Sequence, residues 1–117
     1  IIATGTMLAN ATEAAMKLEA AGVSVRLVDM HTIKPLDIDL VLESAEKTGL
    51  IVTVEEHYLA GGLGSAVAEV LAEKRPTRMH MIAVRDQFCS NGPYDELIGL
   101  YGLQAGQIEE KVKSLLK

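Results

Sequence analysis

The stretch EEHYLAGGLG, residues 55–64, contains the residue types that acid–base chemistry and anion binding need. Its first four residues all carry titratable side chains, and three of the remaining six are glycines. A histidine that follows two carboxylates is a candidate general acid or base, because histidine exchanges a proton near neutral pH. Glycines before a helix let backbone N–H groups approach an anion. A third interpretation is a plain turn from a strand into a helix.

The glycine spacing does not match the loops that commonly hold phosphate groups. It is not the GxGxxG of dinucleotide-binding folds, and it lacks the GK[ST] of a P-loop. We therefore expect residues 55–64 to form a structural turn. Contacts with an anion, or with a neighbouring domain or subunit, stay open for five residues: Glu56, His57, Gly61, Gly62 and Gly64.

No other residues make a self-sufficient catalytic set. The three histidines, His31, His57 and His80, are not spaced as a metal site on one element. His80 alternates with methionines, as a structural residue on a strand does. Cys89 and Ser90 lack a GxSxG elbow and a nearby histidine, so we expect a turn there. We assign no catalytic, cofactor-binding or metal-binding residue.

Strand-like and helix-like segments alternate along the chain. Small and apolar residues at helical spacing predict helices over 7–21, 38–47, 63–74, 94–101 and 105–116. Apolar and β-branched runs predict strands over 1–4, 23–30, 50–56 and 78–84. Asp37 is a candidate N-cap, and Gly22 and Gly49 are candidate helix stops.

This alternation predicts the fold class. Strands that alternate with helices through short loops favour an α/β domain, with a mostly parallel sheet covered on both faces. Residues 1–117 contain no repeat or linker, so we expect one domain. Ligands of such sheets bind beyond the carboxyl ends of the strands. Four segments qualify as functional loops: 5–6, 29–37, 55–64 and 85–93.

Composition limits the partners and the compartment. The formal net charge is -5 and basic residues are scattered, so we expect no nucleic-acid partner. No apolar run approaches the ~20 residues of a membrane span. A single cysteine cannot form an internal disulfide, which fits a reducing, cytoplasmic location. The chain starts inside an expected strand without methionine, so we expect a fragment or subunit of a longer enzyme.

Three segments, taken together, resemble a known family. They are VRLVDMHTIKPLD (25–37), LIVTVEEHYLAGGLGSAVAEVLAE (50–73) and GPYDELIGLYGLQAGQI (92–108). Their order and spacing are similar to those of the C-terminal domain of the transketolase family, over essentially the whole chain. The resemblance implies a three-layer α/β/α fold. It also implies a five-stranded sheet, mostly parallel, with one antiparallel edge strand.

The resemblance further implies a function. Transketolases use thiamine diphosphate and Mg²⁺ to transfer a two-carbon ketol unit between sugar phosphates, as in the pentose phosphate pathway. Two other domains hold the cofactor across the interface of a homodimer. The C-terminal domain is an accessory module that packs against them and supports the dimer. The thiamine-binding GDG motif, its metal-ligand asparagine and the activating glutamate are absent here, so we expect the isolated domain to be inactive.

Other interpretations stay open. 1-Deoxy-D-xylulose-5-phosphate synthases are similar in YDELIGLYGL (94–103) but differ in the loop after the second strand. The β subunits of 2-oxo-acid dehydrogenases share the glycine turn but generally lack YDELIGLYGL. An alternative of another class is a non-enzymatic interaction module, or a small-anion binder at the helix starts 5–7 or 61–64. Because TIKPLD precedes VEEHYLAGGLG, we place transketolase first.

Overall fold

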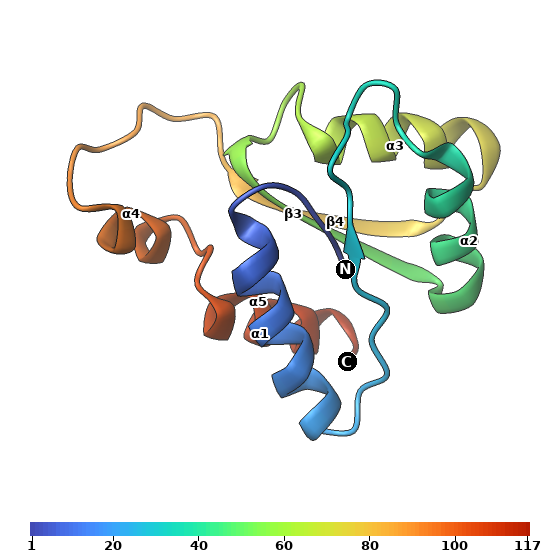
Figure 1. The fold of residues 1–117 in the computed structure, drawn as a ribbon, viewed down its shortest axis with the longest axis horizontal. Coiled ribbons are helices and arrows are strands. Elements are labelled where there is room, and N and C mark those ends of the chain that lie inside the picture. The colour runs from blue at the N-terminus through green and yellow to red at the C-terminus, as the bar shows by residue number, and fades with distance from the viewer.

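Four parallel strands form the sheet, in the order β2-β1-β3-β4 (Figure 1). The computed structural model describes all 117 residues. Its strands are β1 (Ile2–Ala3), β2 (Val28–Asp29), β3 (Leu50–Tyr58) and β4 (Arg78–Val84). The α/β class and the parallel sheet are confirmed. The expected fifth strand and antiparallel edge are not found among residues 1–117, whose four strands are all parallel.

Helices cover both faces of this sheet. On one face lie α1 (Met7–Ala20) and α5 (Ala105–Leu115), and on the other lie α2 (Ile38–Thr48) and α3 (Leu63–Lys74). The short helix α4 (Tyr94–Leu100) follows a long loop that arcs away from the sheet at the left of Figure 1. The three-layer α/β/α arrangement is therefore as expected. No helix is both long enough and apolar enough to cross a membrane.

Each face of the sheet has its own hydrophobic core. β3 supplies both, because its successive side chains point to opposite faces: Val52 and Val54 to the α1/α5 side, and Ile51 to the α2/α3 side. β3 is also a central strand of the sheet, which explains its almost continuous apolar run. The chain's own helices thus cover the apolar residues of the sheet on both sides.

Local sequence signals explain where two helices start or stop. The Asp37 carboxylate accepts a hydrogen bond from the Leu40 N–H at 3.0 Å, so the predicted N-cap of α2 is confirmed. Gly49, with φ of +69°, ends α2 in the left-handed conformation. Gly22 follows α1 with φ of +82°, as predicted for a helix stop.

The second strand is shorter than its sequence indicates. Residues 23–30 read as a strand, yet only Val28 and Asp29 form ladder pairs. The ladder pairs Ile2 with Val28 and Ala3 with Asp29, and residues 23–27 run as irregular backbone. β-branched composition indicates an extended backbone, whereas the ladder also requires a neighbouring strand of matching length.

Candidate functional site

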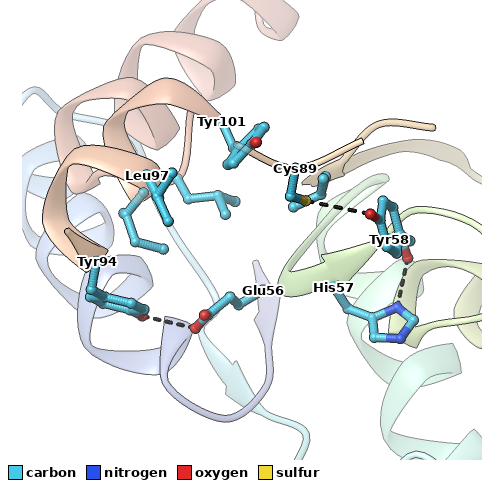
Figure 2. A pocket seen from close by; sticks show the side chains of 10 residues that line it. Glu56, His57, Tyr58, Cys89, Tyr94, Leu97 and Tyr101 are labelled. Atoms are coloured by element: carbon cyan, nitrogen blue, oxygen red, sulfur yellow. Dashed lines mark hydrogen bonds between the residues drawn. The ribbon is translucent and has the colours of Figure 1, made fainter. Parts of the chain in front are cut away.

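A pocket of about 400 Å³ opens beyond the carboxyl ends of β3 and β4 (Figure 2). Its wall combines the end of β3, residue Cys89 of the β4–α4 loop, and α4 with the turn that follows it. Eight of its ten lining residues are hydrophobic, and the polar ones are Glu56 and His57. The pocket therefore lies where parallel α/β sheets usually bind their partners.

All four aromatic residues of the chain gather at this end. Tyr58, Tyr94 and Tyr101 line the pocket, and Phe88 lies in the loop beside Cys89 with its side chain completely exposed. Tyr58 and Tyr94 are also 43% and 50% exposed. The sequence interpretation missed this cluster. The sequence signal that could have found the cluster is position, since every aromatic residue follows the third or fourth expected strand.

The glycine turn is built around a buried carboxylate. Glu55 is only 1% exposed, and its two oxygens accept hydrogen bonds from the N–H groups of Leu63 at 2.7 Å and Gly64 at 2.9 Å. These are the orphan N–H groups at the start of α3, where a negative charge is favourable. The chain's own glutamate thus takes the place that an external anion would use.

Each of the three glycines in the turn has its own structural reason. Gly61 has φ of +83°, a conformation that L side chains rarely adopt, and its N–H donates to the Ser65 hydroxyl at 2.9 Å. A Cβ atom on Gly62 would collide with the Glu55 carboxylate. A Cβ atom on Gly64 would lie 2.9 Å from the Met81 side chain. The turn conformation accounts for the whole glycine pattern without a ligand.

The next residue, Glu56, points to the opposite side and ties three segments together. One of its oxygens accepts a hydrogen bond from the Tyr94 hydroxyl at 2.8 Å (Figure 2). The same oxygen accepts a second hydrogen bond from the Thr6 hydroxyl at 2.5 Å. Thr6 directly precedes α1, and Tyr94 begins α4. The Thr6 contact lowers the pKa of Tyr94, but the bond to Glu56 and burial raise that pKa, and the net change is upward. Glu56 fixes the start of α4 to the sheet.

A second set of contacts holds the β4–α4 loop. The Tyr58 hydroxyl and the Cys89 thiol are 3.4 Å apart, and this hydrogen bond raises the pKa of Tyr58. The Tyr101 hydroxyl accepts a hydrogen bond from the Ser90 N–H at 2.8 Å. Cys89 and Ser90 are therefore bonded to tyrosines rather than to a histidine, and they form no nucleophile–base pair.

The three histidines lie on different parts of the chain and have different surroundings. Nδ1 of His57 lies 2.8 Å from the Tyr58 carbonyl, so this nitrogen carries the proton and donates it. His31 bonds to Thr32, and His80 is half-buried on the edge strand β4. No group of three or more His, Cys, Asp or Glu residues is arranged to hold a metal ion. Of the five open residues, Glu56 and His57 line the pocket, while the glycines lie in the adjoining turn.

The family model described as "Transketolase, C-terminal domain" matches residues 1–108. The chain is 44% identical over 108 residues to the 6-deoxy-6-sulfo-D-fructose transketolase subunit SqwH of Clostridium sp. (strain MSTE9). This alignment covers 92% of this chain and 34% of the relative. It is 40% identical to an apulose-4-phosphate transketolase subunit of Phocaeicola vulgatus, over 88% of this chain and 33% of that one.

Further similarity extends to another enzyme and to a solved structure. The 1-deoxy-D-xylulose-5-phosphate synthase of Heliobacterium modesticaldum is 40% identical over 98% of this chain and 18% of its own length. A solved structure described as a split gene transketolase, inactive beta4 tetramer, superimposes with a TM-score of 0.91 at 46% identity. That match covers 97% of this chain and 37% of the solved one. The chain spans between about a fifth and about a third of the curated relatives it matches.

Proposed function

Because this chain belongs to the transketolase C-terminal domain family, we propose that it is the accessory C-terminal domain of a thiamine-diphosphate-dependent transketolase. The parent enzyme transfers a two-carbon ketol unit between sugar phosphates, as in the pentose phosphate pathway. Its partners are the thiamine-binding domains, on the same chain or on a separate subunit. We further propose a cytoplasmic homodimer, to which this domain contributes packing surface.

The aromatic end of the domain carries this proposal. Aromatic side chains are enriched where protein surfaces bind each other, because each buries a large rigid area at a small loss of entropy. Here a chain with only four aromatic residues places three of them in the wall of one pocket, and the fourth, Phe88, is fully exposed in the adjoining loop. The bonds from Glu56 to Thr6 and Tyr94 hold this surface in place before a partner arrives. Such preorganisation favours docking.

The residues of this chain do not fit a thiamine diphosphate site. The cofactor supplies the reactive carbon of ketol transfer, and it requires a metal ion and donors for its diphosphate. No metal-binding group is arranged here, and the Leu63 and Gly64 N–H groups at the start of α3 already bind Glu55. We therefore assign no step of the reaction to this domain. Its contribution is to position and support the domains that hold the cofactor.

A second candidate is the C-terminal domain of a 1-deoxy-D-xylulose-5-phosphate synthase. The 40% identity over 98% of this chain supports it. We favour transketolase because the identities are higher, at 44% for a transketolase subunit and 46% for the solved split transketolase. Both candidates assign the same role to the aromatic surface, since both enzymes need the domain only as a support.

Calorimetry and activity measurements together test the proposal. Thiamine diphosphate and Mg²⁺ are titrated into the chain alone, and then into the chain combined with the thiamine-binding part of its enzyme. We expect no binding by the chain alone and ketol transfer by the combined protein. Tight binding of the cofactor by the chain alone would contradict the assigned role. Formation of 1-deoxy-D-xylulose 5-phosphate with release of carbon dioxide, in place of ketol transfer, would support the second candidate.

A further inference from the structure

A second cleft, of about 280 Å³, lies between the edge strand β4 and helix α5, and Tyr101 lines both this cleft and the aromatic pocket. Three of its nine lining residues are basic: His80 and Arg85 from β4 and the residue after it, and Lys111 from α5. None of the nine is acidic. In a protein of net charge -5, this cleft is a local concentration of positive charge.

The cations of this cleft have no carboxylate partners. Neither Arg85 nor Lys111 forms a salt bridge, whereas Lys17, Lys47 and Lys113 each pair with a glutamate four residues earlier in their helix. The residue four positions before Lys111 is the uncharged Gln107. Its side-chain oxygen accepts a hydrogen bond from the Gln104 N–H, and its side-chain nitrogen donates one to the Gly99 carbonyl. Arg85 folds back along its strand, with its guanidinium 3.4 Å from the Met81 carbonyl. Both cations therefore keep free donors at the cleft.

We propose that the cleft lined by His80, Arg85 and Lys111 binds the phosphate group of a small molecule, either inorganic phosphate or a phosphomonoester. Two cations and an imidazole around one concave site provide the charge-assisted donors that such an oxyanion accepts. Burial, and then the neighbouring Lys111 and Arg85, lower the pKa of His80. A bound dianion would reverse this effect and recruit His80 as a third cation. This inference does not depend on the proposed function.

An alternative role for these cations is protection of the sheet edge. Charged side chains on an edge strand prevent it from pairing with another sheet, and β4 is an edge strand. That role requires no ligand and predicts no saturable anion binding. It also predicts that loss of the charges promotes aggregation. The two roles therefore differ in a measurable way.

The three histidines allow a direct test by NMR. Imidazole signals are followed while inorganic phosphate, or ribose 5-phosphate in a second arm, replaces chloride at constant ionic strength. We expect saturable shifts of His80 only, with His31 and His57 as internal controls outside the cleft. In sulfate, which does not titrate in this range, the His80 pKa should rise, because a bound dianion favours the charged imidazole. Tighter binding of one of the two phosphate compounds identifies the source of the phosphate group.

Two lysine variants on α5 complete the test. Lys111→Gln should weaken phosphate binding by about two- to fivefold, as expected for one exposed charge pair. Lys113→Gln removes the same charge from the same helix but outside the cleft, so it should leave binding unchanged. The inference fails if His80 shifts linearly and equally with the other histidines. It also fails if both lysine variants have the same effect.

Discussion

The adjacent residues Glu55 and Glu56 have the same side chain but different roles, because one is buried and the other is exposed. Glu55 is buried and binds the N–H groups of Leu63 and Gly64, whereas Glu56 is exposed and binds two hydroxyls. They point in opposite directions because successive side chains of a strand do so. Glu55, from strand β3, caps the start of α3. Glu56 links β3 to the starts of α1 and α4.

We expect Glu55→Gln to destabilise the domain by about 2 kcal/mol. The amide NH₂ cannot accept a hydrogen bond, so one N–H at the start of α3 loses its partner, and the favourable charge is also lost. Urea unfolding measures the change. Glu56→Gln is the matched control, and it should change the unfolding free energy by less than about 1 kcal/mol. Equal effects of the two substitutions would contradict the burial argument.

Gly62→Ala should also destabilise, but only while Glu55 is present. The new Cβ atom meets the Glu55 carboxylate, so the penalty depends on that side chain. In a double-mutant cycle, Gly62→Ala should therefore be much less harmful on a Glu55→Ala background. Gly106→Ala, in open space on α5, should be neutral or stabilising by up to about 1 kcal/mol. Additive effects of the Glu55 and Gly62 changes would rule out the clash.

His80 predicts a pH dependence of stability. Its pKa in the folded chain lies below the ordinary value of 6.5, because of burial first and then of Lys111 and Arg85. The unfolded chain therefore takes up this proton at a higher pH, and stability falls as the pH drops below about 6.5. Lys111→Gln raises the His80 pKa, so its unfolding free energy should fall less between about pH 7 and about pH 5. Lys74→Gln, on α3 outside the cleft, should follow the wild type.

At the scale of elements, the position of α4 is held mainly by hydrogen bonds at its two ends. The helix has only seven residues, and Ile98 is its one buried residue. The Tyr94–Glu56 bond and the Tyr101–Ser90 bond hold its two ends. A short helix attached in this way opens easily when one tie is lost.

Tyr94→Phe should loosen α4 without unfolding the domain. The ring keeps its place in the pocket wall, but the hydrogen bond to Glu56 is lost, which lowers stability by about 1 kcal/mol. Amide hydrogen exchange should quicken in residues 85–100 and stay unchanged in α2. Uniformly faster exchange throughout the chain would show that Tyr94 supports the whole fold instead.

At the scale of the molecule, the two proposed surfaces meet at Tyr101, which lines both the aromatic pocket and the basic cleft. The aromatic pocket uses the carboxyl ends of β3 and β4, and the basic cleft uses the free side of β4. Each face of the sheet is meanwhile covered by the chain's own helices (Figure 1). The loop end and the β4 edge are therefore the two surfaces at which we propose that partners or ligands bind.

Phe88→Ser tests docking at the loop end. The side chain is fully exposed, so the substitution should leave the unfolding free energy of the chain within about 0.5 kcal/mol of wild type. Binding to the thiamine-binding part of the enzyme should weaken by about tenfold or more, as for an aromatic interface anchor. Met16→Ser, which removes another exposed apolar side chain, from α1, is the control. Unchanged binding with Phe88→Ser would place the interface elsewhere.

The sequence by itself determined the class of the fold, the family, the five helices to within one residue at each end, and three of the four strands to within two residues. These features depend on local patterns: Asp37 caps the helix that begins at the next residue, and Gly49 ends that helix. Hydrophobic spacing is local in the same way. The order of the three matching segments sufficed for the family, which the comparisons confirm.

Only the tertiary structure decided the arrangement of the candidate sites. The Glu56 contacts join residues 50 and 38 positions apart, and the aromatic residues meet because parallel strands end at one edge. The order of the strands, β2-β1-β3-β4, is also a tertiary result, since each strand pairs with residues far away in the sequence. Spacing along a chain cannot specify such contacts, because they depend on how the elements pack together.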